Sequence, residues 1–118
     1  KEVMLDDLPP RIALASLDSI EIVEIDKIIQ FQAEGNYTKV FLLNGKSVLV
    51  SRSIKEYEEL VSLSLFFRCH KSHLINFNHI KRVDKHKNFV VMVDDSVAFI
   101  SRRKKAEFYA MMESFLKM

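Results

Sequence analysis

Two short stretches of the chain combine cations with hydroxyl or imidazole groups, and they hold the residues best suited to chemistry. Residues 68–73 have the sequence RCHKSH, and residues 101–105 have the sequence SRRKK. Lysine and arginine side chains neutralise phosphates and reach the edges of guanine bases, and a serine hydroxyl binds a phosphate oxygen. Both stretches are therefore candidates for contact with a nucleic acid, with Lys71 suited to a base edge and Ser72 to a phosphate.

The second stretch also stands where a helix is expected to begin. Apolar residues recur at helical spacing from Phe108 to Leu116, and Ser101 is a suitable N-cap. The positive end of the helix dipole makes each cation in the first turn unfavourable by about 0.3 to 1 kcal/mol. A bound anion would compensate, because free backbone N–H groups, a capping hydroxyl and cations together form a phosphate site. The alternative is a helix that begins later and leaves this stretch as a solvated loop.

The first stretch admits two other chemistries, and both are disfavoured. A metal site would draw on Cys69, His70, His73 and His79. Adjacent Cys and His side chains cannot both point at one ion without strain, and the chain has no second cysteine, so we expect no metal. A cysteine nucleophile would need an exposed thiol, whereas the apolar residues on either side predict that Cys69 is buried. His70 is expected to fix this segment by a hydrogen bond, which is compatible with a contact between Lys71 and DNA.

Nucleotide chemistry and cofactor binding are not expected. The chain has only two glycines, Gly35 and Gly45, which are too few for the glycine-rich loops that hold nucleotides or dinucleotide cofactors. Asp94 and Asp95 are adjacent carboxylates, but they stand at the expected tip of a hairpin, where solvated turn residues are common. We therefore expect neither catalysis nor a cofactor.

The charge of the chain is unevenly divided along the sequence. Its 118 residues include 18 basic and 16 acidic side chains, a net charge of +2. Residues 68–105 hold ten of the basic and three of the acidic residues, a net charge of +7, and the remainder carries −5. One end of the molecule is thus expected to attract polyanions, although the same counts would arise if lysine and arginine only solvated surface strands.

Length and composition indicate one soluble domain. A chain of this length buries enough apolar surface to fold without disulfides or a structural metal. The single cysteine fits a reducing compartment, the longest run without acidic, basic or histidine residues (residues 61–67) is too short to cross a bilayer, and the start of the sequence lacks the apolar core of a signal peptide. We expect a cytoplasmic protein with no membrane contact, in which residues 1–10 are a linker and residues 11–118 are the domain.

The predicted elements are mostly strands. We expect them at residues 12–15, 20–23, 28–33, 38–43, 47–50, 80–83, 88–93 and 96–100. Gly35 and Asn36 tolerate the positive φ of a tight turn, and Asn44-Gly45 is the strongest hairpin signal, so three successive antiparallel strands are expected in this region.

The remaining segments are a helix and a loop. Ser53 and Glu56 match a capping box, which predicts a helix that continues to about residues 63–65. Residues 69–73 are polar and predict an exposed loop. The expected fold class is mostly β, with short antiparallel sheets, one central helix and one C-terminal helix.

Taken in order, these motifs resemble the LytTR (LytR/AlgR-type) family of DNA-binding domains over roughly residues 11–116. The resemblance rests on EGNYT at 34–38, FRCHKSHLIN at 67–76, NHI at 78–80 and SRRK at 101–104. It implies an elongated arrangement of short sheets, used as the C-terminal output domain of a bacterial response regulator whose receiver domain lies upstream. It further implies loops that enter successive major grooves of double-stranded DNA and bend it, typically at direct repeats bound by a pair of chains.

The resemblance also assigns contact residues. Carried over by position, they are Asn36, Thr38, Lys39, His70, Lys71, Ser72, Ser101, Arg102, Arg103 and Lys104. Two positions depart from the family pattern: Phe99 stands where a proline is common, and Lys104 where an aromatic or aliphatic residue is usual. The leading hypothesis is sequence-specific DNA binding for transcriptional control. The alternatives are a non-catalytic module that docks on an acidic protein and an RNA-binding domain, each using the same basic surface.

Overall fold

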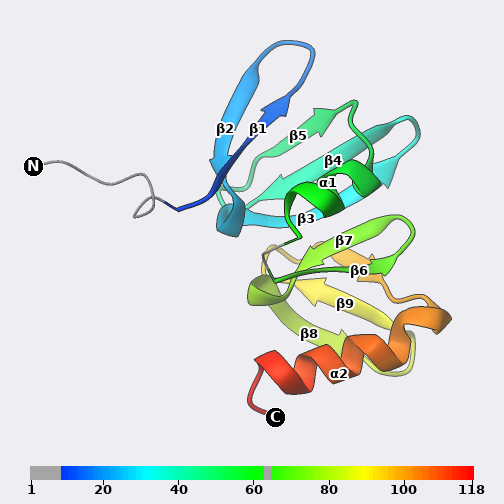
Figure 1. Cartoon of the computed structure of the whole chain (residues 1–118). Helices are drawn as coiled ribbons and strands as arrows, with labels where there is room; N and C mark the ends of the chain where they lie inside the picture. Colours follow the sequence, from blue (N-terminus) through cyan, green and yellow to red (C-terminus); the bar gives the residue numbers. More distant parts are fainter. Residues whose placement is uncertain (1–8, 63–64) are drawn as a thin grey trace, which may run out of the picture.

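The computed structural model describes residues 9–62 and 65–118, which form an elongated body of 49 × 36 × 24 Å (Figure 1). The strands are β1 (Arg11–Ala15), β2 (Ile20–Glu24), β3 (Ile28–Glu34), β4 (Tyr37–Leu42), β5 (Ser47–Val50), β6 (Phe66–His70), β7 (His73–Asn76), β8 (Ile80–Asp84), β9 (Phe89–Met92) and β10 (Val97–Phe99), and the helices are α1 (Ile54–Leu60) and α2 (Lys105–Phe115). The prediction of a mostly β chain with a central and a C-terminal helix is confirmed. Residues 1–8 of the predicted linker lie outside the described residues.

The strands form three antiparallel sheets. A central sheet of five strands has the order β5-β4-β3-β7-β6, a hairpin pairs β1 with β2, and a third sheet has the order β10-β9-β8. The predicted succession of three antiparallel strands is confirmed as β3, β4 and β5. Gly35 and Gly45 take the positive φ that their turns require, at +62° and +85°, whereas Asn36 does not.

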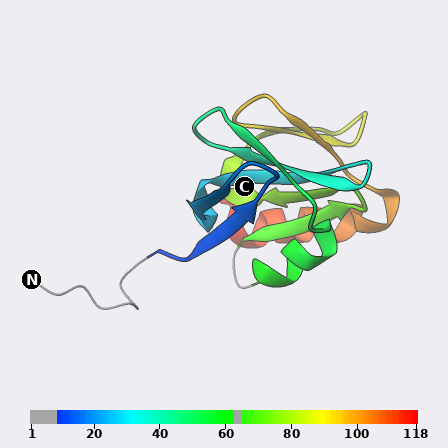
Figure 2. The ribbon, with the colours of Figure 1, turned by 90° about the horizontal axis from the view of Figure 1, so that it is seen from above.

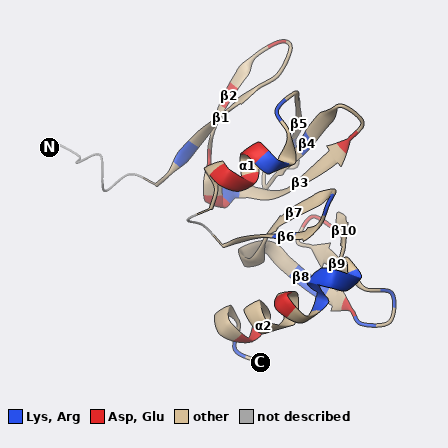
Figure 3. Ribbon diagram, turned by 45° about the vertical axis from the view of Figure 1, so that its right-hand side comes forward, with Lys and Arg blue, Asp and Glu red and all other residues tan. Residues whose placement is uncertain are grey.

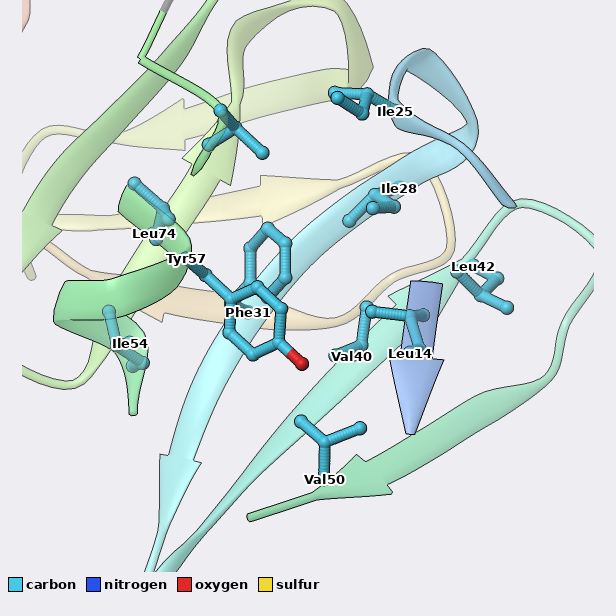
Figure 4. Packing of buried hydrophobic residues seen from close by; sticks show 11 residues of the cluster. Leu14, Ile25, Ile28, Phe31, Val40, Leu42, Val50, Ile54, Tyr57 and Leu74 are labelled. Carbon is cyan, nitrogen blue, oxygen red and sulfur yellow. The ribbon is translucent and has the colours of Figure 1, made fainter. Parts of the chain in front are cut away.

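The central sheet separates two hydrophobic cores. Seen from above, α1 lies on one side of this sheet and the β8–β10 sheet on the other (Figure 2). The first core gathers around Phe31 of β3, whose ring stacks on Tyr57 of α1 with centroids 4.7 Å apart (Figure 4). In the second core Phe108 of α2 packs against Phe67 and Phe77. All the side chains of β7 and most of those of β3, the inner strands of the sheet, are therefore buried.

Helix α1 begins as the capping box predicts. The Ser53 hydroxyl accepts a hydrogen bond from the Glu56 backbone N–H at 3.3 Å, and Ile54 and Tyr57 face the core. The prediction that this helix continues to residues 63–65 is wrong at its end, because α1 stops at Leu60 and the following Val61 is its C-cap. Residues 63 and 64 lie outside the described residues. In the part of the chain that is described, no helix has the length and apolar character needed to cross a membrane.

Candidate nucleic-acid interface

The turn between β6 and β7 presents Lys71 and Ser72, and it is tighter than the sequence suggests. The prediction that residues 69–73 form an exposed loop is wrong. Cys69 lies within β6, His73 is the first residue of β7, and both side chains are buried. Lys71 is exposed, whereas His70 and Ser72 on either side of it are half-buried. Only Lys71 and Ser72 are left between the strands, so a turn of two residues carries the exposed lysine.

Arg68 holds this turn in place. Its guanidinium donates to the backbone carbonyls of His70 at 3.1 Å and Lys71 at 2.6 Å, and it pairs with Glu58 of α1 at 2.9 Å. The prediction that His70 fixes the segment is confirmed, since its Nδ1 accepts a hydrogen bond from the Ser72 N–H at 3.0 Å. The carbonyls of the turn thus point back toward the protein and are satisfied there, which leaves the Lys71 ammonium exposed at its tip.

The turn between β3 and β4 lies next to the Lys71 turn. The Ala33 N–H donates to the Ser72 carbonyl at 2.9 Å, so the two turns are joined through their backbones. Asn36 is exposed at the tip. Thr38 and Lys39 belong to β4 and not to the turn: the Thr38 hydroxyl is buried and donates to the Arg52 carbonyl at 2.8 Å, and the Lys39 ammonium lies 5.1 Å from the centroid of the Phe41 ring. Of these three, Asn36 is the one presented at the tip.

The third segment, residues 101–104, is anchored beside the Lys71 turn as well. The Ser101 N–H donates to the Cys69 carbonyl at 2.8 Å, and the Ser101 carbonyl accepts from the Lys104 N–H at 3.0 Å. The prediction that Ser101 caps the last α-helix is wrong: its hydroxyl makes no capping bond, a 3₁₀ turn (Arg102–Lys104) intervenes, and α2 begins at Lys105. The bond to Cys69 fixes the backbone of Ser101 at the edge of the sheet, so the α-helix starts one turn later.

The cations of this segment differ in how free they are. Lys104 pairs with Glu107 at 3.6 Å, and its ammonium lies 5.6 Å from the centroid of the Phe67 ring. Arg102 and Arg103 are exposed, and within the described residues neither has an ion-pair partner. Both arginines stand at the amino end of α2, where the helix dipole adds to their positive potential.

An aromatic cluster joins the second and third segments. The Phe99 ring lies 5.6 Å from the His73 ring and 6.4 Å from the His70 ring, measured between centroids, and 54% of Phe99 is exposed. Burial, together with the smaller effect of the neighbouring His70, lowers the pKa of His73 to about 4, so His73 is neutral at physiological pH. A neutral imidazole also suits its neighbour Gln30, whose Oε1 lies 3.2 Å from His73 Nδ1.

Together the three segments form one edge of the molecule. Figure 1 shows them following one another down its right-hand side, and Figure 3 turns this side forward. Two hollows flank the Lys71 turn, one reaching Asn36 and Lys55 and the other reaching Lys87, Arg102 and Lys105. We call this surface the basic edge and define it by its exposed cations, which are Lys55, Lys71, Lys87, Arg102, Arg103 and Lys105.

Several residues that form or support this edge were not among the contact residues predicted from the sequence. Arg68 and Lys105 belong to the two candidate stretches but not to the predicted contact residues, Lys87 was only counted among the basic residues of 68–105, and Lys55 lies outside that segment. Their participation depends on which turns meet in space. The charge count of residues 68–105 was the signal that pointed to three of the four.

Cys69 lies behind the basic edge, and its side chain is buried. Burial raises the pKa of the Cys69 thiol to about 12, so this thiol is not a thiolate at neutral pH. Among residues 9–62 and 65–118, no three His, Cys, Asp or Glu side chains are grouped as metal ligands. What the edge offers is hydrogen-bond donors and positive charge.

Comparison with known proteins connects this edge to a family. The sequence model of the LytTr DNA-binding domain family matches residues 18–113. The chain belongs to the LytTr DNA-binding domain family. A solved structure of the LytTr DNA-binding domain of a Bacillus cereus protein, described as a methyl-accepting/DNA response regulator, shares its fold with a TM-score of 0.74 and 25% sequence identity. The match covers 86% of this chain and 95% of that domain. Among curated proteins no match was found.

Membership of the LytTr family agrees with what the geometry offers. Its strands and helices are those of a DNA-binding domain, and the resemblance inferred from the sequence is confirmed. Membership of this family supports DNA binding by the domain.

Proposed function

We propose that this LytTr domain binds double-stranded DNA in a sequence-specific manner through the basic edge. The observation that carries the proposal is the gathering of three separate turns, with Asn36, Lys71 and Arg102 exposed, along one edge of a rigid sheet. Three turns spaced along an edge suit the successive grooves of a duplex, in which amide and cationic side chains reach base edges. The remaining cations would lie against phosphates and set the register.

Each of the proposed contact residues has a place in this scheme. Asn36, Lys71, Arg102 and Arg103 would reach the DNA directly, and Ser72 and Ser101 would approach phosphates. His70 would hold the Lys71 turn, and Thr38 would hold the start of β4 against the Arg52 carbonyl. Lys39 and Lys104 would add positive charge from behind the turns, since each already lies beside an aromatic ring.

The wider role that we propose is transcriptional control by a two-component response regulator. The domain would be residues 11–118, and residues 1–10 would connect it to an upstream receiver domain. Two chains would bind neighbouring direct repeats, so that the second binding event gains from the first. This role is supported by the family and by the description of the Bacillus cereus relative.

The test is a salt titration with competing duplexes. Binding to a duplex selected from a random pool should weaken steeply as salt rises, with a slope of about −0.9 per phosphate neutralised. A scrambled duplex should bind at least about tenfold more weakly, a difference of roughly 1.4 kcal/mol. Equal affinity for both duplexes would overturn sequence-specific binding, and tighter binding to a structured RNA or an acidic peptide would show that the edge serves another partner.

A further inference from the structure

The β1–β2 hairpin has a second apolar face that nothing in the described structure covers. One face of the hairpin carries Leu14, which is fully buried, and Ile12 and Val23, which pack against the first core. Side chains alternate between the faces of a strand, so the remaining residues point away from the protein. We call this surface the outer face, and its residues are Arg11, Ala13, Ala15, Ile20, Ile22 and Glu24.

The outer face is exposed, although its centre is apolar. Ile20 is 67% exposed and Ile22 is 56% exposed. Across the hairpin, Ala13 stands opposite Ile22 and Ala15 opposite Ile20, so each row joins one small and one large side chain. The first row joins opposite charges, Arg11 and Glu24.

These three rows make the outer face complementary to itself. Consider two hairpins packed face to face about a two-fold axis that runs along the strands, so that β1 of one lies over β2 of the other. Each Ile side chain then meets an Ala of the second copy, and each Arg11 meets a Glu24. Each contact between a large and a small side chain, and each contact between opposite charges, therefore occurs twice, as a two-fold interface requires.

We propose that the outer face binds the outer face of a second copy of this chain. The hairpin lies at the opposite end of the molecule from α2, and its outer face is separate from the basic edge, so a pair would leave both basic edges open (Figures 1 and 3). Six residues form a smaller surface than the roughly 800 Å² per partner of a stable complex, and the pair is therefore weak. Two chains related by a two-fold axis are not related by the translation that direct repeats require, so this pair is a state of the free protein.

Sedimentation equilibrium of the whole chain without DNA tests this proposal, and its outcome is independent of the proposed function. The wild-type chain should associate to a dimer as its concentration rises into the millimolar range. The variants R11E and E24R should each weaken this association at least tenfold, because each places like charges opposite one another at both contacts between positions 11 and 24 of the two copies. E21K is the matched control, since it reverses a charge of the same strand on the other face and should leave the association unchanged.

A mixture of the two variants separates contacts between chains from contacts within one. Within each variant the cross-strand neighbours 11 and 24 carry like charges, and mixing cannot change that. Between an R11E chain and an E24R chain, both contacts between positions 11 and 24 regain opposite charges, so an equimolar mixture should associate as the wild type does. A wild-type chain that stays monomeric at millimolar concentration, or a mixture that fails to regain association, would overturn the proposal and leave the face to a different protein or domain.

Discussion

At the scale of single residues, the basic edge separates cations that build the surface from cations that are free to bind. The Arg68 guanidinium donates hydrogen bonds to two backbone carbonyls and to Glu58, and the Lys104 ammonium lies close to Glu107 and the Phe67 ring. Lys71 and Arg102 have no such partners among the described residues. Since all four are basic residues of one sequence stretch, their roles follow from their contacts and not from their charge.

Replacement of Lys71 and replacement of Lys105 should therefore weaken DNA binding in different ways. Lys71→Ala should weaken binding to the selected duplex by about 1 to 3 kcal/mol and relax the preference at one base pair, because the side chain sits at a turn tip that can enter a groove. Lys105→Ala should weaken all duplexes alike and reduce the salt slope by about 1. Affinities for a set of single-base variants of the duplex measure both effects. Equal, sequence-independent losses would show that Lys71 contacts a phosphate only.

The buried His73 should make the stability of the domain depend on pH. Its pKa in the folded chain is about 4, below the ordinary value of 6.5, so the unfolded chain binds the proton more readily between these values. The free energy of unfolding should be independent of His73 above pH 6.5 and fall as the pH is lowered toward 4, by at most about 1.4 kcal/mol per pH unit. Urea unfolding at several pH values measures this slope.

His73→Gln is the control, since an amide can hydrogen-bond to Gln30 but does not titrate. In this variant the fall in stability between pH 6.5 and 4 should become shallower. An unchanged slope would assign the pH dependence to other groups.

At the scale of elements, neighbouring residues in the sequence were enough to predict most strands and the start of α1. The elements that were not predicted depend on contacts between residues far apart in the sequence. The Asn44-Gly45 turn and the Ser53 cap depend on neighbouring residues, so they could be predicted. The start of α2 could not, because it depends on the bond between the Ser101 N–H and the carbonyl of Cys69. The burial of Cys69 was predicted, but that of His73 was not, because the polar residues around it indicated a loop in place of two short strands.

The candidate site divides in the same way. Residues 101–104 and 70–72 were found from charge and from the family motifs, whereas Arg68 as a clamp and Lys55 and Lys87 as neighbours required the sheet order. Thr38 shows the limit of transfer by position, because its side chain is turned inward at a place where a contact was expected.

Position 102, in the turn before α2, should accept a negative charge without loss of stability. Arg102→Glu removes an unpaired cation from the positive end of the helix dipole, so the melting temperature should stay the same or rise while affinity for the selected duplex falls at least about tenfold. Lys104→Glu should instead lower stability by about 1 kcal/mol, because it loses the contacts with Glu107 and the Phe67 ring. Thermal unfolding and duplex titration of both variants decide this. A large drop in melting temperature for Arg102→Glu would contradict the account.

At the scale of the whole molecule, the two cores on either side of the central sheet hold the small turns of the basic edge in place. The β3–β4 and β6–β7 turns leave the same end of one sheet, and Ser101 is tied to that sheet through Cys69. Because the side chains of β7 and most of those of β3 are buried, movement of these turns relative to one another would disturb a core. The opposite charges of the two parts of the sequence also become a spatial division, with the cations concentrated along the basic edge (Figure 3).

The central claim is that DNA is bound by the basic edge, and the most direct measurement is the change of backbone amide NMR shifts during titration of the whole chain with the selected duplex. The largest changes should fall on Asn36, Lys71, Ser72, Arg102 and Arg103, and the amides of β1 and β2 should change little. Changes concentrated on the outer face of the hairpin or on the carboxyl end of α2, with Lys71 and Arg102 unaffected, would contradict the account.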